Sequence, residues 1–177
     1  MTETTQTLLP VAEIAALGAC REGLRWLRDL PEGTTWQQAW EQFARGDWQL
    51  WLLSKQCGPP ESDSRKLLVL AACGCARLAL IYVEDGETRP LAAIATAEAW
   101  ARGEAGVTLE DVRSAGSAAA SAAAAASAAS AAYAASAAYA AASVAYAAYA
   151  ADAETLRKCA DIVRKHYPQA PEVEATV

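Results

Sequence analysis

The chain has 177 residues, which is enough for one domain or for one domain with a long helical extension. Its net charge of −6 and its isoelectric point near 4.8 disfavour broad attraction to nucleic acid and to anionic membranes. The first ten residues, MTETTQTLLP, lack the basic region of a secretory signal, so we expect a cytoplasmic protein.

Residues 1–60 are predicted to be a helical region rich in tryptophan. A helix is expected over residues 10–29, interrupted at Gly18 and stopped by Pro31. The pair Thr35 and Gln38 resembles a capping box that opens a helix ending at Gly46. Asp47 is then placed to cap a helix over residues 48–57.

Five tryptophans lie close together in this region. On consecutive short helices such residues usually belong to the core, and any that are exposed become the best candidates for a binding hot spot. They are Trp26, Trp36, Trp40, Trp48 and Trp51.

Residues 61–167 are expected to form the helical core. The most apolar stretch, residues 67–83, is interrupted by one charge, Arg77, and predicts a central buried helix over about residues 66–83. Pro90 fits the first turn of the next helix, which ends near Gly103.

The last predicted helix is alanine-rich. From 114 to 151 the chain has no charge, no proline and one glycine, Gly116, so helix is strongly favoured from residue 109 to 167. A straight helix of that length would span about 85 Å, so it must bend, break at Gly116 or elsewhere, or project as an arm. Residues 168–177 are expected to be a disordered tail. The predicted fold is thus an all-α multi-helix bundle with a long alanine-rich C-terminal helix.

Tyrosines within the alanine-rich helix give it a seam at heptad spacing. Tyr139 and Tyr146 occupy one row, and Tyr149 and Leu156 occupy the other. Such a seam needs a partner helix, from the same chain or from a second copy, and these four residues are candidates for partner binding.

Three arginines complete the candidate partner-binding residues. Arg77 is either paired with an acid such as Glu84, Asp85 or Glu98, or forms an anion or partner site. Arg157 and Arg164 belong to a cationic helix end that favours a solvated face, with a small phosphate-binding face as the alternative.

The sequence supplies no recognisable catalytic constellation. It has one His, no glycine-rich phosphate loop and no base beside its serines. Residues two apart on a helix point about 200° apart, so the thiols of Cys73 and Cys75 should diverge. We therefore expect a non-enzymatic protein with no metal and no cofactor, whose cysteines are small buried residues.

Three motifs resemble one known family. They are RKLLVLAACGCARLAL (65–80), AIATAEAWARGE (93–104) and the TLEDV start of an alanine, tyrosine and serine run. They are similar to alanine-rich proteins of bacteria and phages labelled putative immunity proteins, over roughly residues 60–167. The resemblance implies neutralisation of a toxin or defence effector by binding, and it transfers no catalytic residue.

The leading hypothesis is a protein-binding module, an immunity-like or phage anti-defence inhibitor that sequesters a partner protein. The first alternative is a structural homo-oligomer, such as a homodimer, assembled through the alanine-rich helix. The second alternative, a weak nucleic-acid or nucleotide binder, fits the acidic charge less well.

Overall fold

The computed structural model describes residues 9–83, 85–126 and 153–174. These described residues form helices and contain no strand, which confirms the all-α prediction. The helices are α1 (Val11–Ala16), α2 (Arg21–Arg28), α3 (Trp36–Gln42), α4 (Gly46–Gln56), α5 (Asp63–Arg77), the 3₁₀ helix η1 (Leu78–Tyr82), α6 (Arg89–Arg102), α7 (Leu109–Ala126) and α9 (Ala153–His166).

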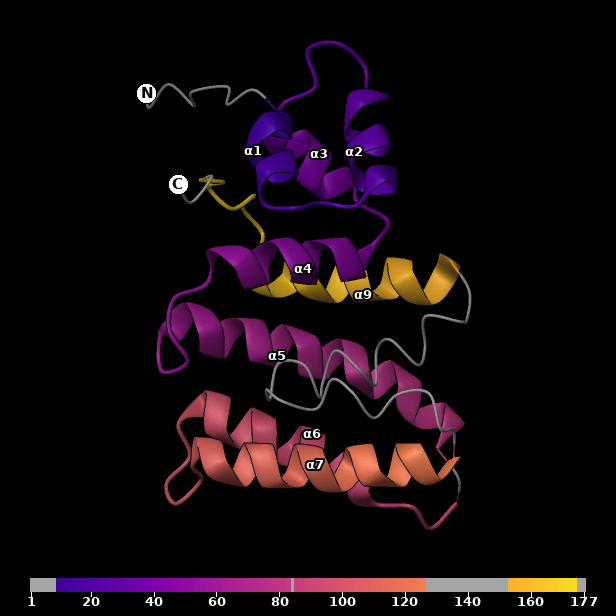
Figure 1. The fold of residues 1–177 in the computed structure, drawn as a ribbon, viewed down its shortest axis with the longest axis vertical. Coiled ribbons are helices and arrows are strands. Elements are labelled where there is room, and N and C mark those ends of the chain that lie inside the picture. The colour runs from indigo at the N-terminus through magenta and orange to yellow at the C-terminus, as the bar shows by residue number, and fades with distance from the viewer. Residues whose placement is uncertain (1–8, 84, 127–152, 175–177) are drawn as a thin grey trace.

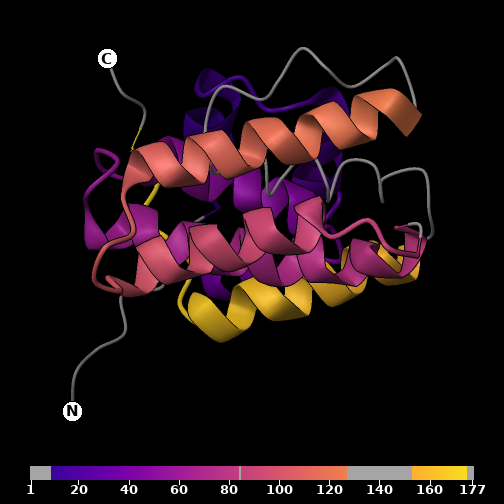
Figure 2. The same ribbon diagram turned by 90° about the horizontal axis from the view of Figure 1, so that it is seen from below.

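The helices stack in layers along the long axis of the molecule (Figure 1). The short helices α1, α2 and α3 form one end, and α4 lies beside α9 below them. Next comes α5, which packs against α9 on one side and α6 on the other. The far end is the pair of α6 and α7, seen in full in Figure 2.

Helix α5 is buried on two opposite faces, as the apolar stretch predicted. Leu68, Ala71 and Cys75 join the core shared with α3, α4 and α9. Val69 and Cys73 join a second core with α6 and α7. The thiols of Cys73 and Cys75 therefore diverge as expected, because residues two apart on a helix point about 200° apart.

The structure confirms several local features that were predicted from the sequence. Thr35 and Gln38 form the predicted capping box, and Gly18, at a φ of 87°, separates α1 from α2. Pro90 lies in the first turn of α6, whose end is the left-handed Gly103. The central helix begins earlier than predicted, since the Ser62 hydroxyl accepts the Arg65 N–H, and its last part tightens into η1.

The prediction that Gly46 ends a helix is wrong. Helix α3 already ends at Gln42, and Gly46 is the first residue of α4. A Cβ built on Gly46 would lie 2.5 Å from both the Ala160 nitrogen and the Cys159 Cβ. Because Gly46 has no side chain, α9 can pack directly against the backbone of α4 at this position. Asp47 lies inside α4 and does not cap it with its side chain.

The described residues do not form a single long alanine-rich helix. Helix α7 runs through Gly116 without a break and packs on α6, whereas α9 packs on α4 and α5. The two helices lie on opposite sides of α5 (Figure 1). One straight helix from residue 109 to 167 is therefore excluded, and residues 127–152 lie outside the described residues.

Residues 168–174 lie against α3, where we had expected a disordered tail. The Trp36 indole donates a 2.8 Å hydrogen bond to the Pro171 carbonyl oxygen, and the Ala170 N–H donates one of 2.7 Å to Gln37. These bonds join residues more than 130 positions apart, so they are invisible to local sequence patterns.

Candidate partner-binding site

The predicted arginine site on α5 is an ion pair with an acidic residue of α6. Arg77 donates two hydrogen bonds of 2.8 Å to Glu98 of α6, and Arg102 adds a third of 3.2 Å. Glu98 is one of the few buried charged residues described. Hydrogen bonding from Arg77 is the main cause that lowers the pKa of Glu98. Arg77 thus binds Glu98, one of the acids proposed as its partner, whereas Glu84 lies outside the described residues.

The residues of α9 that were predicted to bind a partner lie in different environments. Arg164 donates a 2.7 Å hydrogen bond to the Phe43 carbonyl oxygen and also contacts Asp161. Leu156 is half-buried and Arg157 is exposed. The other three predicted residues, Tyr139, Tyr146 and Tyr149, lie outside the described residues.

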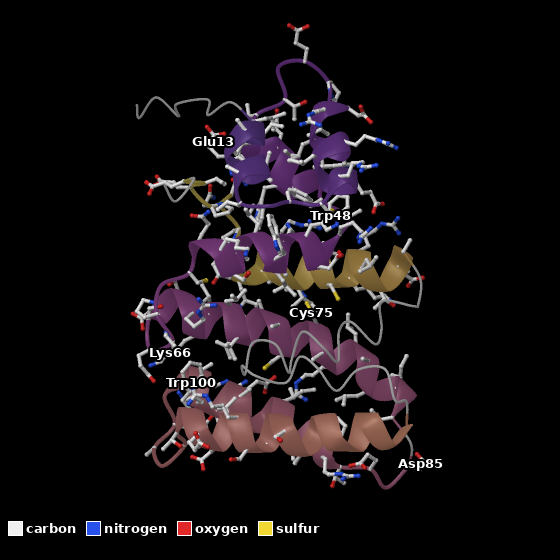
Figure 3. All side chains as sticks on the ribbon, viewed as in Figure 1. Glu13, Trp48, Lys66, Cys75, Asp85 and Trp100 are labelled. Atoms are coloured by element: carbon white, nitrogen blue, oxygen red, sulfur yellow. The ribbon has the colours of Figure 1, made fainter. Side chains whose placement is uncertain are left out.

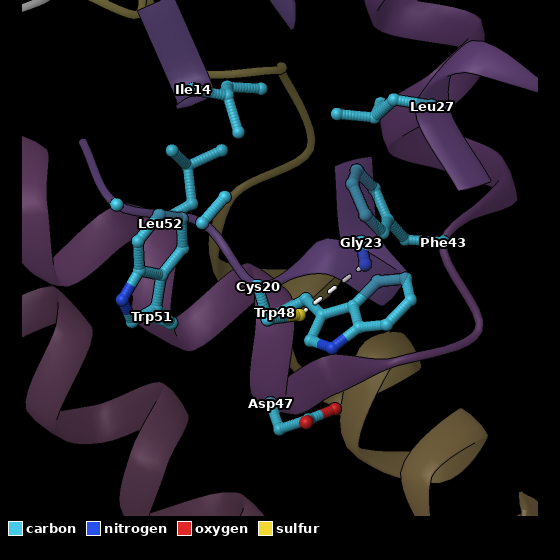
Figure 4. A pocket seen from close by; sticks show the side chains of 11 residues that line it. Ile14, Cys20, Gly23, Leu27, Phe43, Asp47, Trp48, Trp51 and Leu52 are labelled. Atoms are coloured by element: carbon cyan, nitrogen blue, oxygen red, sulfur yellow. Dashed lines mark hydrogen bonds between the residues drawn. The ribbon is translucent and has the colours of Figure 1, made fainter. Parts of the chain in front are cut away.

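An open apolar pocket of about 290 Å³ lies among α1, α2 and α4 (Figure 4). Helix α4 supplies its largest side chains, Trp48 and Trp51. The rest of the apolar lining comes from Ile14, Leu27, Phe43 and Leu52. Trp48 and Trp51 are half-buried, so each keeps part of its ring accessible. A pocket of this character suits an apolar group more than an ion.

Neighbouring aromatic rings hold the pocket wall in place. The Phe43 ring lies 4.6 Å from Trp26 and, edge-on, 6.3 Å from Trp48. Such tilted and edge-to-face pairs are the favoured aromatic geometries. Figure 3 places Trp48 where the α1–α3 layer meets α4. The Arg45 guanidinium lies 4.6 Å from the centre of the Trp48 ring.

Two polar side chains at this pocket, Asp47 and Cys20, are hydrogen-bonded to neighbours. Both Asp47 carboxylate oxygens accept hydrogen bonds from Arg45, at 2.9 and 2.8 Å. The Cys20 sulfur accepts the Gly23 N–H at 3.3 Å, the dashed contact in Figure 4. These hydrogen bonds hold the side chains at the rim of the pocket in place. The apolar wall is then the main surface that a ligand could contact.

The buried thiols are distributed over two cores. Burial raises the pKa of Cys73 to about 12, and a hydrogen bond with Cys159 together with burial raises the pKa of Cys75. Within the described residues, no three His, Cys, Asp or Glu side chains gather in a way that would hold a metal ion. None of the described helices combines the length and apolar character that a membrane crossing needs.

The tryptophans stand out in the sequence, whereas the pocket does not. Trp36 and Trp40 are buried as predicted, whereas Trp26, Trp48 and Trp51 are half-buried. The pocket forms where α1, α2 and α4 pack together, and residue spacing within one helix does not predict which helices pack against each other. The available signal was the density of tryptophans, together with the rule that exposed ones become binding hot spots.

The described residues thus form an all-α fold with an open, mostly apolar pocket. The family model described as Imm-5 like putative immunity protein matches residues 58–169, and the chain belongs to this family. The match spans α5 to α9, whereas the pocket residues precede it. No curated protein and no solved structure matches the chain.

Proposed function

We propose that the protein is a non-enzymatic inhibitor that binds a protein toxin and neutralises it by covering part of the toxin's surface. Membership of an immunity-protein family supports the biological role. The observation that carries the binding mode is the open apolar pocket beside the half-buried Trp48 and Trp51. Tryptophan is among the residues most enriched in binding hot spots.

The pocket would receive an apolar side chain of the toxin as an anchor. Removing apolar surface from water stabilises a complex by about 25 cal/mol per Å², and the ring faces of two tryptophans supply much of that surface. The Arg45–Asp47 pair at the rim would exclude water around the anchor, as the polar rim of an interface does. The net charge of −6 would speed association with a cationic toxin.

A neutralisation titration tests the proposal. Proteins encoded beside this gene that arrest growth when produced alone are purified and mixed with increasing amounts of the chain. An inhibitor that acts by occupancy abolishes toxicity at a fixed ratio, about one chain per toxin, whatever the incubation time. Neutralisation far below that ratio, increasing with time, would indicate an enzyme. Failure to neutralise any such protein would also contradict the proposal.

A further inference from the structure

Two cysteine side chains meet where α5 packs against α9. The Cys75 thiol donates a 3.7 Å hydrogen bond to the Cys159 carbonyl oxygen, and the two thiols are also hydrogen-bonded to each other. Figure 3 places Cys75 between these two helices. The two sulfur atoms are therefore neighbours across a helix interface, although the residues are 84 positions apart in the sequence.

Two glycines let α9 approach its neighbours closely on either side of this contact. A Cβ built on Gly46 of α4 would lie 2.5 Å from the Cys159 Cβ. A Cβ built on Gly74 of α5 would lie 2.8 Å from the Ile162 Cγ2. A disulfide forms only between cysteines whose backbones lie close, with Cα atoms within about 7 Å of each other. The glycines thus provide the close helix packing that a bond between Cys75 and Cys159 needs.

The neighbouring cysteine of α5 does not take part in this contact. Cys73 belongs to the core shared with α6 and α7, and its thiol donates to the Ile94 carbonyl oxygen at 3.9 Å. Cys75 and Cys159 both belong to the other core. The chain therefore contains a matched control, because Cys73 is a buried cysteine of the same helix that faces away from α9.

The two thiols in contact differ in reactivity. The hydrogen bond from Cys75 lowers the pKa of Cys159, whereas the same bond and burial raise the pKa of Cys75. The thiolate is the nucleophilic form of a cysteine, so Cys159 is the first of the pair to react. Cys159 is also the more accessible residue, at 5 % exposed against 1 % for Cys75.

We propose that Cys75 and Cys159 are a redox-sensitive pair, which a peroxide converts into a disulfide that joins α9 covalently to α5. The Cys159 thiolate attacks one oxygen of hydrogen peroxide, the O–O bond breaks, and a sulfenic acid and hydroxide form. The Cys75 sulfur then attacks the Cys159 sulfur, and the sulfenic oxygen leaves as water with the Cys75 proton. The two thiols lose two electrons, and the peroxide is reduced to two molecules of water. A small thiol reverses the reaction by disulfide exchange.

The disulfide would stabilise the fold. It joins residues 84 positions apart, so it restricts the unfolded chain far more than the folded one. For a chain of this size, the melting temperature should rise by about 5–10 °C on oxidation. Neither cysteine lines the pocket at Trp48, so the inference stands independently of the proposed function.

Peptide mapping of the full chain tests the pair. The reduced chain is treated with hydrogen peroxide, the remaining thiols are alkylated, and the protein is digested with trypsin without a reductant. Mass spectrometry should find LLVLAACGCAR (67–77) joined to CADIVR (159–164), with a mass two hydrogens below the sum of the two peptides. Fragmentation of the joined peptides should assign the bond to Cys75. Dithiothreitol should separate the peptides and return the melting temperature to that of the reduced chain.

Two variants sharpen the assignment. Cys75→Ala should abolish the joined peptides and the rise in melting temperature, whereas Cys73→Ala should keep both. Circular dichroism checks that each variant is folded. The fragmentation of the wild-type peptides assigns the bond even if one variant unfolds.

Three outcomes would overturn the proposal. The first is the absence of the joined peptides after peroxide treatment of the folded wild-type chain. The second is a bond that fragmentation assigns to Cys73, or one that joins two chains. The third is an oxidised chain that melts no higher than the reduced chain, since the bond would then not hold α9 on α5.

Discussion

The carboxylate of Glu98 accepts two hydrogen bonds of 2.8 Å from the guanidinium of Arg77, which joins α6 to α5. The Glu98 side chain is only 11 % exposed, whereas the Arg77 side chain is 43 % exposed. Because the carboxylate of Glu98 is largely shielded from water, its negative charge needs the hydrogen bonds from Arg77. The guanidinium of Arg77 is still partly hydrated and depends less on the pair.

Glu98→Gln should lower the free energy of unfolding by about 1–2 kcal/mol at pH 7, since charge-assisted hydrogen bonds from two arginines become neutral ones. The pKa of Glu98 is lower in the folded protein than in the unfolded chain, where it is about 4.3. The ionised carboxylate therefore stabilises the fold fully at a pH above the unfolded-state pKa. This stabilisation is lost as the pH falls through the folded-state pKa. Urea unfolding at pH 7 and at acid pH checks this. The difference from wild type should shrink at acid pH, and a constant difference would contradict the pairing.

A matched control for this pair lies just beyond the end of α6. Glu104→Gln makes the same chemical change at a side chain 54 % exposed, whose contact with Arg102 is 3.7 Å. Exposed pairs contribute little, so the change in stability should stay below about 0.5 kcal/mol.

Gly46→Ala should destabilise the fold by at least about 2 kcal/mol. The added methyl group would lie 2.5 Å from backbone and side-chain atoms of α9, so the helices must move apart. Thermal unfolding followed by circular dichroism measures the effect. A melting temperature equal to that of wild type would show that α4 and α9 do not approach each other as described.

Gly23→Ala should have the opposite effect. Here the added Cβ would lie 3.5 Å from the Cys20 sulfur and 3.7 Å from the Trp48 ring, which are ordinary contacts. Alanine in a helix is more stable than glycine by about 0.5–1 kcal/mol, so unfolding should need more urea. The same methyl group narrows the pocket, so this variant should be more stable and yet bind the toxin more weakly. Tighter toxin binding would place the interface elsewhere.

Cysteine labelling should distinguish the pocket from the core. Cys20 is exposed at the pocket, whereas Cys73 is buried with its pKa raised to about 12. A maleimide at neutral pH should therefore modify Cys20 first and leave Cys73 unmodified until denaturant is added. Mass spectrometry of the labelled peptides measures the order, and Cys20→Ser should remove the fast phase. Rapid labelling of Cys73 in the native protein would contradict its burial.

Local signals predicted much of this fold because they act within one turn of helix. The capping box at Thr35 and Gln38 and the proline at the start of α6 are of this kind. The central helix was predictable because a continuous apolar run fits a helix buried on both faces.

The remaining features depend on contacts between distant segments. Gly46 has two physical uses, ending a helix or admitting a neighbour, and only the position of α9 decides between them. Alanine propensity predicts helix but says nothing about where that helix packs, so the sequence left its path open, and the packing of α7 on α6 and of α9 on α4 and α5 was not predictable. Likewise, the hydrogen bonds that order residues 168–174 come from α3, at the other end of the chain.

The most direct measurement is the affinity of the neutralised toxin for purified wild-type chain and for two alanine variants, by titration calorimetry. Trp51→Ala removes a hot-spot ring from the pocket, and Ile81→Ala truncates a side chain that is 79 % exposed and does not line it. We predict one toxin per chain, a loss of affinity of about thirtyfold for Trp51→Ala and no change for Ile81→Ala. An unchanged affinity for a folded Trp51→Ala variant would contradict it.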